Sequence, residues 1–235
     1  VLKKAVHVME IVGNREFSDY RDLSDDECHA LIKGAKVSLG DDLVILGHHY
    51  QRADVYQHAD LKGDSLKLSR LASQANSEHI VFCGVHFMAE VADIMSKPSQ
   101  KALLPDLAAG CSMADMANLS KVNRAWVELE SVLGNKMSVT PITYINSAAD
   151  LKAFCGEHGG IVCTSSNASR IVSWGLTEKD KILFFPDQHL GRWSGHQLGL
   201  INESDMKVWD PDLWMGGLTE EEIKAAKILL WTGSG

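Results

Sequence analysis

Polar and titratable side chains recur where apolar segments of the sequence end. The first three such places are residues 48–50 (HHY), 84–88 (GVHFM) and 110–112 (GCS). A histidine can be an acid, a base or a metal ligand near neutral pH, and a tyrosine can carry protons. A thiol among small residues can ligate a metal or act as a nucleophile. His48 and Tyr50 are therefore candidate acid–base groups, and Cys111 is a candidate metal ligand.

The second half of the chain repeats this arrangement at residues 144–147 (YINS), 164–167 (TSSN) and 188–191 (QHLG). Tyr144, Asn146 and Ser165 offer hydrogen-bonding groups at these places. A polar turn between a strand and a helix suits a phosphate or a carboxylate, because the first N–H groups of the helix are free. The TSSN turn lacks the glycine and lysine of a nucleotide-binding P-loop. A plain helix cap explains the same turn, and both interpretations remain open.

Two further segments in the first half have both a functional and a structural interpretation. Residues 63–65 (GDS) open a helix, so Ser65 could help to bind an anion, although an ordinary cap fits equally well. Phe87 and Met88 follow a flexible glycine and could form the wall of a ligand site or simply part of the core.

The elements that would position these residues alternate between apolar strands and amphipathic helices, which is typical of an α/β fold with parallel sheets covered on both faces. Helical patterns begin after Ser24 and after Thr219, each followed three positions later by a glutamate, as in a capping box. The predicted strands are residues 43–47, 79–84, 102–105, 139–145, 160–164, 182–185, 207–210 and 228–231.

The chain also contains an internal similarity. Residues 104–110 (LPDLAAG) resemble residues 185–191 (FPDQHLG), which lie 81 positions later. This similarity indicates a duplicated three-layer αβα unit, unless two common strand ends coincide by chance. We expect a helical segment at 1–41, a first unit at 42–120, a second at 121–200, and a linker with the truncated start of a third at 201–235.

Composition excludes several classes of function. The formal net charge is −8, whereas a general nucleic-acid binder needs clustered basic residues. No apolar run approaches the roughly 18–20 residues that span a bilayer, and the beginning of the chain has no signal-peptide pattern. The five cysteines are irregularly spaced, which favours free or metal-bound thiols in the cytoplasm over disulfides.

Seven strings occur together and in order: GHHYQ, ADLKGDSLKLS, VFCGVHFMAEVADIM, LLPDLAAGCSMAD, TYINSAADLKA, VCTSSNA and FFPDQHLGR. In these strings the sequence resembles the quinolinate synthases, from about Asp42 to Trp231. The resemblance implies three αβα units around a pseudo-threefold axis and a [4Fe–4S] cluster held by three cysteines. It also implies a transferase of NAD biosynthesis that condenses iminoaspartate with dihydroxyacetone phosphate. Aspartate oxidase or aspartate dehydrogenase would supply the iminoaspartate.

The resemblance assigns roles to individual positions. It makes Cys111 a cluster ligand, His48 a substrate-binding histidine and Tyr50 a proton shuttle. The wall and the remaining substrate contacts would come from Ser65, Phe87, Met88, Tyr144, Asn146 and Ser165. His49 is a mild departure from the family pattern.

The larger departure is at the end of the sequence. The family continues from the last strand into a Gly-x-Cys-x-Val-His segment, whereas this chain reads Gly233-Ser234-Gly235. Cys163 does not replace the missing ligand, because the family pattern makes it a strand-end residue. We therefore expect this chain alone not to assemble the cluster.

Two other functions compete with this interpretation. One is a non-catalytic two-domain remnant that binds anionic metabolites, which a stop codon directly after residue 235 would favour. The other is a zinc or mononuclear-metal hydrolase using His48, His49 and Cys111. Metal analysis separates the hydrolase from an iron–sulfur enzyme.

Overall fold

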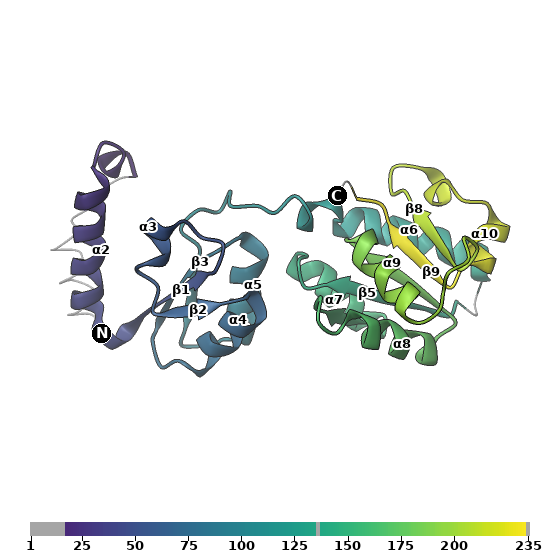
Figure 1. Cartoon of the computed structure of the whole chain (residues 1–235), viewed down its shortest axis with the longest axis horizontal. Coiled ribbons are helices and arrows are strands. Elements are labelled where there is room, and N and C mark those ends of the chain that lie inside the picture. The colour runs from purple at the N-terminus through teal and green to yellow at the C-terminus, as the bar shows by residue number, and fades with distance from the viewer. Residues whose placement is uncertain (1–16, 135–136, 234–235) are drawn as a thin grey trace. The chain divides into compact units, whose positions relative to one another are not determined.

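The computed structural model describes residues 17–134 and 137–233, which form two compact units. One unit extends to Ala109, and the other begins at Gly110 (Figure 1). Each unit is built around a sheet whose described strands are all parallel. The prediction of an α/β fold with repeated αβα units is confirmed.

The first unit has a four-stranded sheet in the order β2-β1-β3-β4. Its strands are β1 (Leu43–His48), β2 (Leu61–Gly63), β3 (His79–Cys83) and β4 (Lys101–Leu103). Its helices are α2 (Asp25–Leu39), α3 (Ala53–Tyr56), α4 (Ser65–Gln74) and α5 (His86–Met95), with the short turns η1 (Phe17–Tyr20) and η2 (Gly40–Asp42).

Helix α2 begins as predicted. The Ser24 side chain accepts a hydrogen bond from the Glu27 backbone, and the Glu27 carboxylate accepts one from the Ser24 backbone at 2.8 Å. These two bonds satisfy N–H groups that a helix start leaves free.

Helices α4 and α5 pack against each other and cover one face of this sheet. Leu46, Ile80 and Phe82 point into that layer and are completely buried. Burying these apolar side chains stabilises the layer and fixes the ends of β1 and β3 relative to the start of α5.

The second unit has a five-stranded sheet in the order β6-β5-β7-β9-β8. Its strands are β5 (Val139–Tyr144), β6 (Ile161–Cys163), β7 (Lys181–Phe185), β8 (Met206–Trp209) and β9 (Ile228–Trp231). Its helices are α6 (Leu119–Leu133), α7 (Ala149–Glu157), α8 (Ala168–Glu178), α9 (Gln188–Gln197) and α10 (Glu220–Ala225), with the turns η3 (Ala114–Met116) and η5 (Trp214–Gly217).

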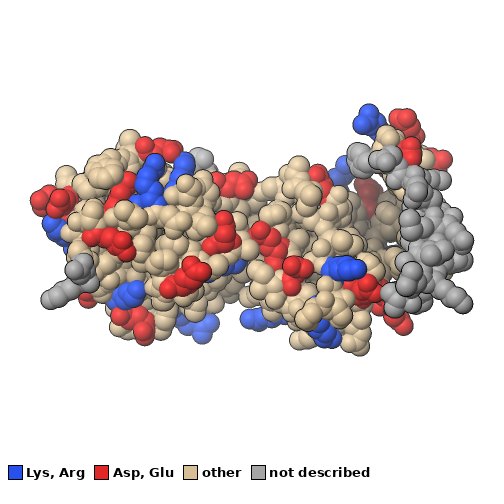
Figure 2. Space-filling model, turned by 180° about the vertical axis from the view of Figure 1, so that it is seen from behind, with Lys and Arg blue, Asp and Glu red and all other residues tan. Residues whose placement is uncertain are grey.

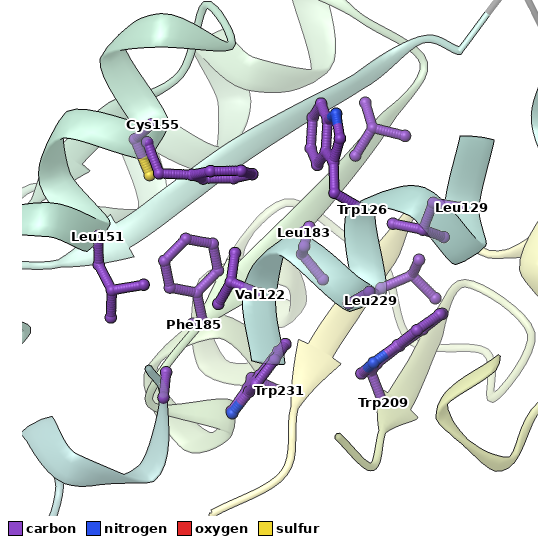
Figure 3. Packing of buried hydrophobic residues seen from close by; sticks show 14 of the residues in the cluster. Val122, Trp126, Leu129, Leu151, Cys155, Leu183, Phe185, Trp209, Leu229 and Trp231 are labelled. Atoms are coloured by element: carbon purple, nitrogen blue, oxygen red, sulfur yellow. The ribbon is translucent and has the colours of Figure 1, made fainter. Parts of the chain in front are cut away.

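Both faces of the second sheet carry a buried core. Figure 3 shows the core on one side, where Trp126, Phe185, Trp209 and Trp231 gather among aliphatic side chains. The other face packs on α8 and α9 through residues such as Val172 and Phe184. The second capping box, at Thr219 and Glu222, is present as predicted.

The structure divides the chain differently from the predicted boundaries. Helix α6 and the strands β8 and β9 all belong to the second unit, because β9 pairs with β7 and β8 pairs with β9. Residues 201–235 therefore do not begin a separate unit here. The 81-residue offset is also wrong as a structural alignment, since it matches the central strand β3 with the edge strand β6. By topology, β1, β2 and β3 correspond to β5, β6 and β7.

On the face in Figure 2, acidic and basic side chains are interspersed, and no broad basic area of the kind that nucleic acids require is visible there. Among the described helices, none has both the length and the apolarity needed to cross a bilayer.

Candidate functional site

The predicted site residues lie in two clusters, one in each unit. The first cluster surrounds the carboxyl end of β1, where an apolar strand delivers His48 as its last residue. The His48 ring is almost buried and lies 4.2 Å from the His49 ring and 3.9 Å from the Tyr50 ring, between centroids. Three predicted or neighbouring aromatic groups are thus brought together.

Hydrogen bonds fix the tautomer of His48 and the contact of the Tyr50 hydroxyl. The Tyr50 backbone N–H donates to His48 Nδ1 at 3.4 Å, so the neutral ring carries its proton on Nε2. The Tyr50 hydroxyl donates to Met88 Sδ at 3.6 Å, and the side chain of Tyr50 is half-exposed. The tyrosine is therefore held by its hydroxyl while about half of its side chain is exposed.

The environment keeps His48 uncharged. Burial, together with the neighbouring His49, lowers the pKa of His48 to about 4, and the Asp64 carboxylate acts in the opposite direction. At neutral pH this imidazole is therefore a neutral hydrogen-bonding group, with a donor at Nε2.

Helix α4 begins beside this cluster. The register of β1 and β2 places His48 opposite Gly63, whose carbonyl accepts a hydrogen bond from the His49 N–H at 3.2 Å. Asp64 is the helix cap and accepts from the Lys67 N–H at 2.9 Å. The capping role thus belongs to Asp64, and the partly exposed Ser65 is the first residue of the helix.

Phe87 and Met88 lie in the first turn of α5 and are both 3% exposed. Gly84 allows this close packing, since a Cβ there would come within 2.8 Å of the Phe82 ring and 3.0 Å of Met88 Sδ. The two interpretations of these residues are compatible, because Met88 is part of the core and also contacts Tyr50.

The second cluster lies at the carboxyl ends of β5, β6 and β7. Tyr144 ends β5, and its hydroxyl is hydrogen-bonded by the side chain of Ser165. Burial raises the pKa of Tyr144, and the neighbouring Asp187, Cys163 and Cys111 act in the same direction, whereas the bond to Ser165 lowers it. Tyr144 therefore stays protonated at neutral pH and can donate to an anionic oxygen.

The turn after β5 is fixed by buried hydroxyl groups. Ser147 Oγ donates to the Tyr144 carbonyl at 2.8 Å and accepts from Thr143 Oγ1 at 2.9 Å. Both hydroxyl-bearing residues are completely buried. Between them, the Asn146 amide points to Met113 Sδ at 4.0 Å. Asn146 is thus held between the end of β5 and the turn that carries Cys111.

Cys111 begins a tight turn, in which its carbonyl accepts a hydrogen bond from the Asp115 N–H at 3.0 Å. The far end of the turn is tied to β9, since Trp231 Nε1 donates to the Met116 carbonyl at 3.0 Å. The thiol itself is partly exposed. A buried tryptophan therefore anchors the turn that presents Cys111.

The TSSN segment forms the predicted turn between β6 and α8. Asn167 Oδ1 accepts from the Thr164 N–H at 2.7 Å, and Thr164 Oγ1 lies 3.0 Å from Ser166 Oγ. Ser165 and Ser166 are exposed, so their hydroxyl groups remain accessible. Asn167 occupies the N-cap position of α8 without a capping bond from its side chain, and Ser165 contacts Tyr144.

The other cysteines do not extend the site. Cys155 and Cys163 are buried; burial raises the pKa of Cys163 to about 12 and also raises that of Cys155, so both stay protonated. Cys28 and Cys83 are only partly buried. Within the described part of either unit, no group of three His, Cys, Asp or Glu side chains could hold a metal. Taken by themselves, the described residues of either unit therefore form neither a mononuclear zinc site nor a complete iron–sulfur site.

Sequence reasoning missed several residues of these clusters. Ser147 and Thr143 gave no signal, because small hydroxyl residues are common near strand ends. Asp187 lies in a string that was recognised, yet its electrostatic effect on Tyr144 depends on the pairing of β5 with β7. Met113 was likewise identifiable only as a neighbour of Cys111.

The chain is similar to known proteins over most of its length. The family model described as "Quinolinate synthetase A protein" matches residues 31–235. This chain belongs to that family. The match includes both clusters, so their residues lie within the part of the chain that defines the family.

Curated relatives are similar in sequence to this chain over almost all of its length. A quinolinate synthase of Corynebacterium glutamicum is 53% identical over 92% of this chain, which corresponds to 54% of that protein. One from Herpetosiphon aurantiacus is 52% identical over 94% of this chain and 60% of its own length. One from Rhodopirellula baltica is 49% identical over 95% of this chain and 60% of its own length. The chain thus spans little more than half the length of these curated relatives.

Proposed function

We propose that the whole protein is a quinolinate synthase of de novo NAD biosynthesis. It would condense iminoaspartate with dihydroxyacetone phosphate to quinolinate, phosphate and water. The observation that carries this proposal is the family match over residues 31–235, which contains both strand-end clusters. The polar groups of these clusters suit two small anionic substrates.

In the first cluster, Tyr50 is the proposed proton carrier. Condensation and dehydration both require protons to be moved between oxygen, nitrogen and carbon atoms, which a positioned hydroxyl can do. The Tyr50 side chain is half-exposed, and its hydroxyl donates a hydrogen bond to Met88 Sδ. His48, kept neutral by burial, would hold substrate through Nε2 without adding a charge.

In the second cluster, the protonated Tyr144 would donate a hydrogen bond to a carboxylate or phosphate oxygen. Ser165 and Asn146 would add a hydroxyl and an amide, whose geometry tolerates either anion. Ser65 would serve a carboxylate in the same way at the start of α4. Phe87 and Met88 would form an apolar wall that excludes water from the reacting atoms.

We also propose a [4Fe–4S] cluster as cofactor of the whole protein, with Cys111 as one ligand. Of the five described cysteines, the family resemblance makes only Cys111 a ligand, so this chain would not hold the cluster by itself. The remaining ligands would come from the part of the protein that the curated relatives have in addition. When bound, the cluster would supply an open iron that acts as a Lewis acid.

Iminoaspartate is unstable in water, so an aspartate oxidase or aspartate dehydrogenase would supply it close to its site of use. A cytoplasmic location follows from that supply and from the free thiols of the chain.

Analysis of the anaerobically purified whole protein tests this proposal against the zinc hydrolase. We expect a brown protein with about four iron and four sulfide per chain. A colourless protein containing zinc would contradict the cofactor, and failure to form quinolinate when iron is fully loaded would contradict the reaction.

A further inference from the structure

The face of the first sheet opposite α4 and α5, which no described element fills, has the properties of a helix-binding groove. We propose that it binds an amphipathic helix supplied by the portion of the whole protein that this chain does not include. The proposal concerns the assembly of the protein and is independent of the reaction that it catalyses.

The two faces of this sheet are packed differently. Figure 1 shows α4 and α5 on one side of the strands and α2 on the other. On the α2 side, Ile45, Val81 and Cys83 line a cavity of about 640 Å³. A parallel sheet is normally buried on both faces, so an apolar floor beneath a cavity of this size calls for a covering element.

Helix α2 forms the opposite wall without filling the space. Cys28, Ile32, Ala35 and Leu39 line the cavity from one face of the helix, at spacings of four, three and four residues. No residue of α2 is buried, and Ile32 remains 37% exposed. The helix thus presents an apolar stripe that none of the described residues covers.

The second unit shows how the equivalent space is filled. Helix α6 has the same 15 residues in length as α2 and also precedes the first strand of its sheet. It buries Val122, Trp126 and Leu129 in a core to which α10 contributes Ile223 and its C-cap residue Ala226. In the first unit, α5 leads directly to β4, and the described chain contains no counterpart of α10.

The groove is already formed and has a charged rim. His29 Nδ1 on α2 lies 2.7 Å from His58 Nε2, just after α3, and this contact joins the two walls at one end. Asp25, Lys36, Arg52 and Asp54 also line the cavity and carry both signs of charge. An apolar floor with a mixed polar rim suits an amphipathic helix, and a preformed groove lowers the entropy lost on docking.

The length of the relatives indicates where the helix that fills the groove comes from. The chain corresponds to only 54% and 60% of two close relatives, so whole proteins of this family contain enough additional sequence for a further helix. In the second unit, the covering helix α10 comes from much later in the chain than α6. A later segment covering the first unit would repeat this arrangement.

Photo-crosslinking of the whole protein tests the assignment. A benzophenone amino acid at position 32 should crosslink to a peptide from outside residues 1–235, as identified by mass spectrometry. The control is the same probe at position 37, which is 84% exposed on α2 and does not line the cavity. Crosslinks from position 32 to residues 1–16, to a second copy or to no peptide would each overturn the proposal.

The benzophenone at position 32 could itself prevent the helix from docking, so a stability measurement provides an independent test. In the whole protein, Ile32→Glu should lower the midpoint of thermal unfolding by at least about 3 °C more than Val37→Glu, because the charge would be buried without a partner. Equal shifts for the two variants would show that the groove stays open, which contradicts the proposal.

Discussion

At the scale of single residues, His48 links the packing of β1 to the chemistry at its end. Its ring is almost buried, and its pKa is lowered to about 4 by that burial, so the folded protein disfavours the imidazolium. An unfolded chain has no such restriction and takes up a proton near pH 6.5. His48 therefore makes folding stability depend on pH.

The sign of this dependence follows from the lowered pKa. Stability should be complete above about pH 6.5 and should fall as the pH drops from there towards 4, by at most about 3 kcal/mol from this residue. Urea unfolding between pH 4 and pH 7 measures this loss, and His48→Gln should reduce it. His58, whose pKa is also lowered by burial, contributes in the same direction, so His58→Gln should reduce the loss as well. An unchanged pH dependence in His48→Gln would refute the assignment.

Tyr50 is the residue on which the proposed proton transfer depends. Tyr50→Phe removes only the hydroxyl that contacts Met88 and keeps the stacking with His48. In the whole protein we expect turnover to fall by at least about 100-fold, since a positioned acid–base group contributes about 10²–10⁴. The iron content should not change. Turnover within a few fold of the wild type would remove Tyr50 from the mechanism.

At the scale of elements, the strand ends could be predicted from the sequence, but the contacts among them could not. Continuous apolar runs followed by polar residues located the ends of β1, β5 and β6. The turn of Ser147 and Thr143 and the anchoring of the Cys111 turn by Trp231 depend on which strands are neighbours. That order arises from packing in three dimensions and leaves no local pattern in the sequence.

The anchoring of the Cys111 turn gives a prediction at this scale. Trp231→Phe removes the hydrogen bond to the Met116 carbonyl and leaves a small cavity, which should cost about 1–3 kcal/mol in the free energy of unfolding. If the turn positions a cluster ligand, the iron content of the whole protein should also fall.

The control for this effect is Trp209→Phe, a similarly buried tryptophan in the same core. Its stability loss should be comparable, whereas its iron content should remain normal. Equal iron content in both variants would show that Trp231 stabilises the core without positioning Cys111.

At the scale of the whole molecule, the fold class followed from the alternation of strands and helices, whereas the division of the chain did not. The sequence similarity between residues 104–110 and 185–191 reflects two strand ends with the same local function. It does not reveal that β8 and β9 extend the second sheet. Strand β9 pairs with β7, and the chain between β8 and β9 contains α10. Strand order in a parallel sheet depends on such long connections.

The cluster assignment belongs to this scale too, because it requires residues from more than this chain. Cys111→Ala in the whole protein should abolish the visible absorption and the electron paramagnetic resonance signal of the cluster. Cys163→Ala, which alters a buried core thiol, should leave both spectra in place. An unchanged spectrum in Cys111→Ala would refute its role as a ligand.

The most direct measurement of the central proposal is product formation by the anaerobically purified whole protein. With iminoaspartate generated in place and dihydroxyacetone phosphate added, chromatography should detect quinolinate and inorganic phosphate in equal amounts. Omission of either substrate should abolish both products. A folded, iron-loaded protein that releases no quinolinate under these conditions would contradict the proposed function.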